Sequence, residues 1–166
     1  MITKILTKNF YKTIMLNREE LKEIIGSLEP DATFSEGTQL LEVTVPAEKL
    51  YALAEKLKSD SRTAFDYMIN HTAVDFVKNF TVVYHLESTE KRHLVVLKSV
   101  LEDRDNAKVD SLTALYPAVE YFEREVFDLF GIHYNNHPYL KRFYLEDGAG
   151  FPLRKDYRDE VNIIER

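Results

Sequence analysis

EREVFDLFGIHYNNHP, residues 123–138, marks the point where regular structure ends in the C-terminal third of the chain. Large apolar residues recur at helical spacing up to Gly131, and glycine commonly ends a helix in the left-handed conformation. Beyond Gly131 the periodicity is lost, and asparagine, glycine and proline recur. The sequence therefore predicts a last helix that starts near Pro117 and ends at Gly131, followed by an extended segment.

Two earlier helices are predicted from their start signals. Asn17 can cap a helix, with Glu20 three residues on as in a capping box, and Pro30 ends it. Pro46 suits the first position of a second helix, where its missing N–H is not needed. That helix is expected to bury one apolar stripe, made of Leu50, Leu53, Ala54 and Leu57.

Alternating apolar residues predict strands in four segments, residues 38–46, 64–76, 79–87 and 92–101. The polar segment ESTEK, between the last two, is typical of a hairpin turn. The charged segment EDRDNAKVDS, which follows the last strand, is interpreted as a solvated connection.

Hairpin-linked strands with helices between groups predict an α+β fold. We expect a two-layer sandwich of a mixed or antiparallel sheet with helices over residues 1–131. Residues 132–166 are expected to form an extended C-terminal docking tail.

The N-terminal segment, Met1 to Arg18, holds lysines and no acid, which faintly resembles a mitochondrial targeting peptide. Such peptides are usually rich in Arg and Ser, and this segment is not. A mature segment that packs on the domain is therefore favoured.

Composition excludes several classes of function. A net charge of −6 speaks against general nucleic-acid binding, which needs a basic face. The chain has no cysteine, so it cannot hold a disulfide, a thiolate nucleophile or a cysteine-ligated cluster. It also lacks glycine-rich phosphate-binding motifs and any apolar run near the roughly 18 residues that cross a bilayer.

Catalytic and metal-binding interpretations are weak. His133 and His137 have the four-residue spacing of helical metal ligands, but Gly131 ends the helix before them, so two hydrogen-bonded or partner-contacting loop histidines are favoured. Glu120 and Asp128 each lie four residues from Arg124, which predicts helix ion pairs rather than acid–base catalysis. Eleven of the twenty Tyr and Phe residues lie after residue 115, and aromatic residues with Arg are enriched in protein interfaces.

Three motifs carry a resemblance to a known family. They are E-R-E-x-x-D-x-F-G-I at 123–132, H-P-x-L-x-R at 137–142 and P-L-R-K-D-Y at 152–157. In this order and spacing they resemble the signature region of the 30 kDa subunit, also called the C subunit, of NADH:quinone oxidoreductase (respiratory complex I). The resemblance covers about a quarter of the chain, residues 116–157.

The resemblance implies a cofactor-free structural subunit of the peripheral arm, in a complex whose other subunits carry NADH, FMN, iron–sulfur clusters and quinone. Its main partners would be the large hydrogenase-like quinone-module subunit and that subunit's iron–sulfur neighbour. It would lie on the cytoplasmic face of the bacterial inner membrane, attached through partners, or less expectedly on a mitochondrial matrix face. A docking role then falls on Glu123, Arg124, Glu125, Asp128, His137, Pro138, Arg142, Pro152, Leu153, Arg154, Lys155 and Asp156.

Two departures from the family pattern leave an alternative open. Phe122 stands where relatives often have Trp before E-R-E, and the approach to P-L-R-K-D is Gly-Ala-Gly-Phe at 148–151. The alternative is the equivalent subunit of a membrane-bound hydrogenase, formate hydrogenlyase or reduced-coenzyme dehydrogenase.

Overall fold

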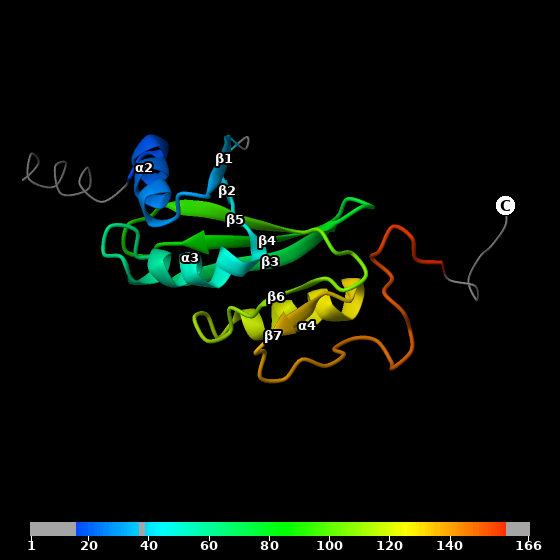
Figure 1. Ribbon diagram of the computed structural model, residues 1–166. Coiled ribbons are helices and arrows are strands. Elements are labelled where there is room, and N and C mark those ends of the chain that lie inside the picture. Colours follow the sequence, from blue (N-terminus) through cyan, green and yellow to red (C-terminus); the bar gives the residue numbers. More distant parts are fainter. Residues whose placement is uncertain (1–15, 37–38, 159–166) are drawn as a thin grey trace, which may run out of the picture.

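The computed structural model describes residues 16–36 and 39–158 (Figure 1). The predicted N-terminal segment therefore lies, up to residue 15, outside the described residues, as do residues 159–166 at the end of the tail.

The three predicted helices are confirmed. Helix α2 spans Arg18–Leu28, and its capping box is present: the Asn17 side chain accepts from the Glu20 N–H at 3.0 Å, and the Glu20 carboxylate accepts from the Asn17 N–H at 2.8 Å. Helix α3 spans Ala47–Ser59 and buries its whole predicted stripe. Helix α4 spans Val119–Phe130 and ends at Gly131, whose φ of 73° is left-handed, as predicted.

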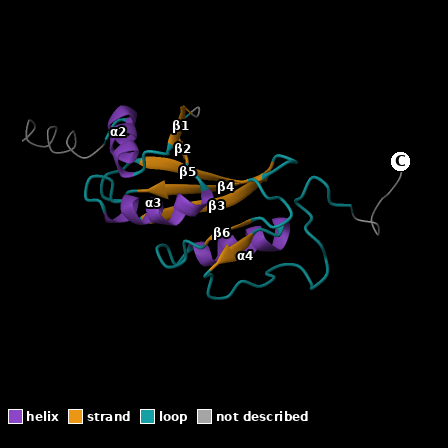
Figure 2. Cartoon of the chain, viewed as in Figure 1, coloured by secondary structure: helices purple, strands orange, loops and turns teal. Residues whose placement is uncertain are grey.

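A mixed five-stranded sheet forms the other layer (Figure 2). Its strands lie in the order β1-β2-β5-β4-β3, with β2 parallel to β5 and the other neighbours antiparallel. Their bounds are β1 Thr33–Glu36, β2 Leu41–Thr44, β3 Tyr67–Asp75, β4 Phe80–Glu87 and β5 Leu94–Leu101. The strand β1 was not predicted, because four mostly polar residues give no readable alternation.

Helices and one face of the sheet share a single core, which confirms the α+β two-layer fold. Alternate residues of the central strands, such as Tyr84 and Leu97, belong to the same apolar cluster as Leu53 and Val126 of the helices. Figure 1 shows α3 in front of the strands and α4 below them, beside β6 and β7. Val83 and Val96 are buried on the opposite face and lie outside this cluster.

A second, two-stranded parallel sheet joins segments on either side of α4. It pairs β6, Lys108–Asp110, with β7, His133–Asn135. Ile132 and Tyr134 are fully buried in the core, so the first residues after Gly131 pack within the domain. From residue 136 to residue 158 the chain consists of turns and bends. None of the described helices is long and apolar enough to cross a membrane.

Candidate docking site

Asp128 is the anchor of the first half of the tail. Its side chain is fully buried on α4 and accepts the backbone N–H groups of Phe143, Tyr144 and Leu145 at 3.0, 2.6 and 3.0 Å. Burial alone would raise the pKa of this carboxyl, but the three N–H donors and Arg142 outweigh it and hold the pKa below its usual value. The carboxylate therefore fixes a tight turn of the tail against the helix.

Arg142 completes this anchor. Its Nη1 donates to the Asp128 carboxylate at 3.0 Å, to the Asp128 backbone oxygen at 2.7 Å and to the Gly150 oxygen at 2.9 Å. Its guanidinium also lies over the ring of Phe151, 4.8 Å from the centroid. One arginine thus connects the helix to two separate stretches of the tail.

The predicted ion pair between Arg124 and Asp128 is wrong. Asp128 pairs with Arg142 instead and also accepts three backbone N–H groups of the tail. Arg124 donates to the backbone oxygens of Lys141 and Arg142 at 3.4 and 3.3 Å and lies over the Phe143 ring at 4.8 Å. It therefore contacts the tail rather than the acids of its own helix.

Arg154 anchors the second half of the tail. Its Nε donates to the backbone oxygen of Phe130 at 2.5 Å, which satisfies a carbonyl at the C-terminal end of α4. Its guanidinium lies over the rings of Phe80 and Phe151, at 5.2 and 4.6 Å. The P-L-R-K-D-Y motif is consequently held against its own domain.

Asp75, at the end of β3, holds the same part of the tail. Arg104 donates to both of its oxygens, at 2.6 and 2.9 Å, and the backbone N–H of Lys155 donates at 2.8 Å. Arg104 also pairs with Asp156 at 2.6 Å. The arginine holds the pKa of Asp75 well below its usual value.

The interpretation of EDRDNAKVDS as a solvated connection is therefore wrong. Arg104 is largely buried, and strand β6 lies within this segment.

Glu123 is fully buried inside the domain. It accepts from the Ser111 hydroxyl at 2.5 Å and from the Leu112 N–H at 2.8 Å, and His137 Nε2 lies 4.0 Å away. Burial raises the pKa of Glu123 to about 7. The group is enclosed, with neither it nor the His137 side chain exposed. It holds the segment before α4 to the helix and does not face a substrate-accessible cleft.

We predict that Glu123→Gln removes one component of the pH dependence of stability. The folded chain holds the Glu123 proton up to about pH 7, whereas the unfolded chain releases it near pH 4.3, so ionisation destabilises the fold as pH rises between these values. The free energy of unfolding of the variant, relative to the unsubstituted chain, should rise by about 3 kcal/mol across this window. Urea unfolding at several pH values measures it.

The Glu123 variant and the unsubstituted chain must be compared at each pH, because the titration of His71 changes the free energy of unfolding in the opposite direction to that of Glu123. Burial lowers the pKa of His71 to about 3, so neutral His71 makes stability rise with pH up to about 6.5. This contribution is common to both chains and cancels in the difference. Glu125→Gln, on the same helix, is the matched control. A difference between the Glu123 variant and its parent that stays constant with pH would contradict the assignment.

The other residues predicted to dock occupy mixed environments. His137 binds within the chain, with Nε2 at 3.1 Å from the Glu120 backbone oxygen and Nδ1 accepting from the Tyr139 N–H at 3.0 Å. Glu125 and Pro152 are half-buried. The exposed members of the predicted set are Pro138, Leu153, Lys155 and Asp156. Within the described residues, no three His, Cys, Asp or Glu side chains converge as a metal site would require.

Exposed aromatic side chains lie beside these anchors. Tyr121 of α4 is 57% exposed, and Phe143 and Tyr144 of the tail are 40% and 63% exposed. Their rings form a chain of contacts, with 6.1 Å between the centroids of Tyr121 and Phe143 and 4.4 Å between Phe143 and Tyr144. We call Tyr121, Phe143 and Tyr144 the aromatic surface. Asp128 holds the two tail residues of this surface by their backbone.

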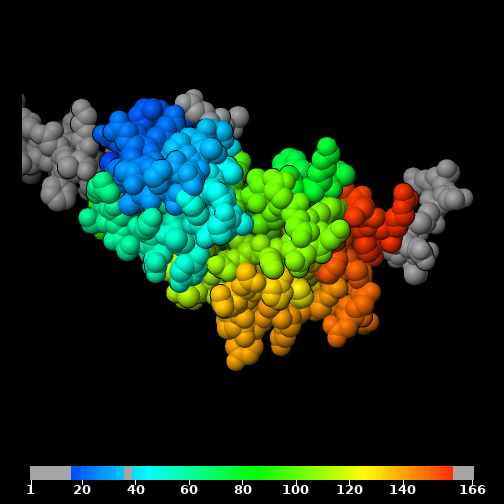
Figure 3. Space-filling view, viewed as in Figure 1, coloured from blue at the N-terminus to red at the C-terminus, as the bar shows by residue number. Residues whose placement is uncertain are grey.

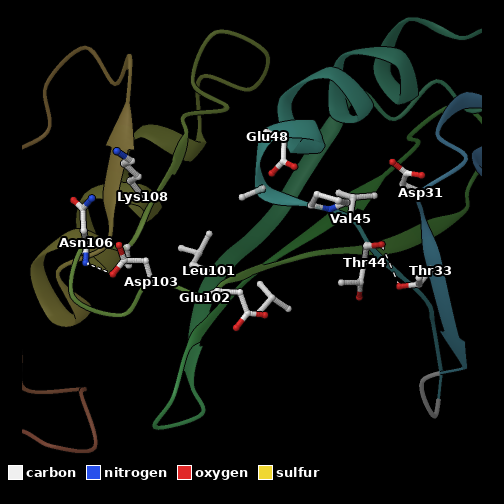
Figure 4. Close-up of a pocket in the computed structure, with 14 residues that line it drawn as sticks. Asp31, Thr33, Thr44, Val45, Glu48, Leu101, Glu102, Asp103, Asn106 and Lys108 are labelled. Carbon is white, nitrogen blue, oxygen red and sulfur yellow. Dashed lines mark hydrogen bonds between the residues drawn. The ribbon is translucent and has the colours of Figure 1, made fainter.

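Two hollows lie on the described part of the fold. The larger, about 590 Å³, lies at the ends of β2 and β5 beside the start of α3 (Figure 4). Of the carboxylates around it, Asp31 pairs with Lys49, Glu102 accepts from Asn79 and Asp103 accepts from the Asn106 N–H. The smaller, about 210 Å³, lies between β3, α4 and Leu153. Three of the four carboxylates at the larger hollow are thus engaged within the chain, and Glu48, at the start of α3, is the fourth.

The described residues define a class of protein: a two-layer α+β domain whose charged motifs hold a tail in place and whose surface carries a group of exposed aromatic side chains. Such an arrangement is typical of a subunit that assembles with others. The chain belongs to the family of the respiratory-chain NADH dehydrogenase 30 Kd subunit, which it matches over residues 43–161.

Individual relatives agree with this assignment. The C subunit of the NADH-quinone oxidoreductase of Moorella thermoacetica is 41% identical over 132 residues, covering 78% of this chain and 87% of the relative. The corresponding C subunit of Ruegeria pomeroyi is 39% identical over 142 residues, covering 83% and 68%. A chain in the structure of the membrane-bound sulfane sulfur reductase, an archaeal respiratory membrane complex, superimposes with a TM-score of 0.73 at 29% identity, covering 86% of each chain.

Proposed function

We propose that this chain is a structural subunit of the peripheral arm of a proton-translocating NADH:quinone oxidoreductase and that it docks on the large hydrogenase-like quinone-module subunit. The observation that carries the proposal is the aromatic surface on α4 and the tail, held in place by buried charges. Large exposed rings beside an arginine are the residues that dominate binding energy in protein interfaces.

In this proposal the predicted docking residues have two different roles. Glu123, Asp128, Arg142 and Arg154 shape the tail from within, and the aromatic surface and Leu153 contact the partner. Preorganisation by Asp128 and Arg142 would lower the entropy cost of docking, because the rings do not need to be ordered on binding.

The chain itself is proposed to bind no cofactor and to perform no catalysis. Its lack of cysteine supports this, since iron–sulfur clusters are held by cysteine thiolates. NADH, FMN, the iron–sulfur clusters and quinone would be bound by other subunits, among them the iron–sulfur neighbour of the large subunit. Attachment through these partners would hold the chain at the cytoplasmic face of a bacterial inner membrane.

The double variant Tyr121→Gln, Tyr144→Ser tests the proposal. The variant and the unsubstituted chain are produced together in the host with different tags, the complex is isolated through another subunit, and the two forms are quantified by mass spectrometry. We expect incorporation of the variant to fall about thirtyfold or more, since an interface hot spot contributes about 2 kcal/mol or more.

Tyr67→Ser is the matched control, because Tyr67 is 51% exposed and lies on β3. It should be incorporated normally. The thermal midpoints of all the isolated chains should agree, because the substituted rings are exposed. Normal incorporation of the double variant would refute docking through the aromatic surface.

A second candidate is the equivalent subunit of a related respiratory membrane complex, such as a membrane-bound hydrogenase, formate hydrogenlyase or reduced-coenzyme dehydrogenase. The structural similarity to a chain of the sulfane sulfur reductase complex favours it. The two candidates differ in the module that supplies electrons. Identifying the subunits that copurify with the tagged chain, and assaying NADH:quinone activity in the same eluate, distinguishes them.

A further inference from the structure

Exposed large apolar side chains in the described part of the chain fall into two groups. One group lies on α4 and the tail, and it includes the aromatic surface. The other lies entirely on β3 and the turn that follows it: Tyr67, Ile69, Val74, Phe76 and Val77. The most exposed of this second group are Phe76 and Val77, at 58% and 59%. They form the tip of the β3–β4 hairpin.

The backbone of this tip is strained. Val77 has φ of +73°, in the left-handed region that β-branched residues rarely adopt. Two hydrogen bonds keep the turn closed: the Phe76 N–H donates to the Asn79 oxygen at 3.0 Å, and the Val77 N–H donates to Asp75 Oδ1 at 2.6 Å. A glycine or asparagine would adopt this conformation more easily. Valine therefore costs backbone energy at this position that glycine or asparagine would not.

Asp75 makes the hairpin tip rigid and connects it to the tail. The same carboxylate that accepts from Val77 also accepts from Arg104 and from the Lys155 N–H. The Arg104 guanidinium lies over the Phe80 ring, 4.6 Å from its centroid, so the base of the hairpin is packed as well as hydrogen-bonded. The two exposed side chains are thus presented on a fixed support, next to residues 155–156.

We propose that the hairpin tip is a second anchor, which inserts Phe76 and Val77 into an apolar recess on a neighbouring protein subunit of the complex. The inference goes beyond docking through the aromatic surface and rests on the proposed function only in that a neighbouring subunit is present. A rigid apolar projection binds with a small entropy cost, because no side chain or loop has to be ordered first.

Continuity with the tail favours a protein recess over a membrane surface as the occupant, since Asp75 holds the tip and residue 155 together. The charges around the tip are mixed: Glu102 accepts from Asn79 Nδ2 at 3.2 Å, Asp156 lies at the base through Arg104, and the exposed Lys78 belongs to the turn itself. A partner recess therefore needs polar groups of both signs around its apolar centre. Figure 3 shows the green hairpin region adjacent to the red end of the tail on the visible face.

Two variants separate the proposed anchor from a purely structural turn. Val77→Asn suits the left-handed backbone and removes the apolar side chain, so the thermal midpoint of the isolated chain should stay equal or rise, while incorporation into the complex falls about tenfold. Phe76→Ser should reduce incorporation at least as much with an unchanged midpoint. Incorporation is measured by competition between two differently tagged forms, with Tyr67→Ser, at the opposite end of β3, as the control.

The outcomes distinguish this inference from the proposed function. If Val77→Asn and Phe76→Ser are incorporated normally while the double variant of the aromatic surface is not, the hairpin anchor is wrong and tail docking stands. If the hairpin variants are excluded and the aromatic variant is not, the anchor is correct and the aromatic surface is not the docking site. Val77→Asn tests the recess even if Phe76→Ser fails to fold. A cross-link from p-benzoylphenylalanine at position 76 to lipid alone, with no protein adduct, would overturn the choice of a protein recess.

Discussion

Replacing Asp128 with alanine is expected to lower the free energy of unfolding by about 3–5 kcal/mol, because the change leaves Arg142 without its buried partner. Three backbone N–H groups lose their acceptor at the same time, and each must find water or remain unsatisfied. Residues 142–151 should lose their ordered structure first, since Asp128 and Arg142 connect that stretch to α4. Urea unfolding gives the total, and hydrogen exchange shows where protection disappears.

Asp128→Asn and Asp147→Ala are the matched variants for this prediction. Asparagine keeps one acceptor oxygen but not the charge, so we expect an intermediate loss. Asp147 is an exposed tail residue, and its removal should change stability by less than about 0.5 kcal/mol. A loss of under about 1 kcal/mol for Asp128→Ala would show that the tail is not held by this carboxylate.

Gly131→Ala is expected to cost about 2–4 kcal/mol, the second large effect. A Cβ at this position would lie 2.7 Å from the Phe151 ring and 2.8 Å from Arg154 Nη2. The left-handed φ of +73° adds a backbone penalty of about 1 kcal/mol to this overpacking. The tail would have to move off the end of α4, so loss of the Arg154 hydrogen bond to Phe130 should accompany the change in stability.

Gly148→Ala separates the two contributions to this effect. Gly148 also has a positive φ, +90°, but a Cβ there meets nothing within 4 Å. It should cost only about 1 kcal/mol, the backbone penalty. Thermal unfolding of both variants measures the difference. Equal losses in the two variants would mean that Phe151 and Arg154 do not press against the helix end in solution.

The secondary structure was largely predictable because its signals are local. Asn17 and Glu20 form their capping box within one turn, and Gly131 ends α4 by its own conformation. The alternation of Phe80, Val82, Tyr84 and Leu86 identified the face of β4 that packs in the core. Strands β6 and β7 were not predicted, since three residues carry no periodicity and their pairing depends on the position of α4 between them.

The partners of the charged residues could not be predicted, because they are distant in sequence. Asp75 accepts from the N–H of Lys155, 80 residues away, and Arg104 contacts Asp156, 52 residues away. Local spacing favoured Arg124 as the partner of Asp128. In the folded chain Asp128 pairs with Arg142 instead, and the same carboxylate accepts the backbone N–H groups of a turn in the tail. A fully buried Glu123 has no local signature either.

The charged residues of the family motifs make contacts within the chain, whereas the exposed aromatic rings beside them are free to contact a partner. The E-R-E-x-x-D-x-F-G-I motif and the P-L-R-K-D-Y motif contact each other where Arg154 donates to the Phe130 oxygen and lies against Gly131. Substitutions in these motifs should therefore act first on the shape of the tail and only then on assembly. Substitutions in the aromatic surface should act on assembly alone.

The most direct test of docking is a cross-link from the aromatic surface within the assembled complex. p-Benzoylphenylalanine is placed at position 144, the complex is isolated from gently solubilised membranes and irradiated, and the adduct is identified by mass spectrometry, with position 67 as the reference site. The account predicts an adduct between position 144 and the large hydrogenase-like quinone-module subunit. Efficient incorporation of the labelled chain with no adduct to that subunit would contradict it.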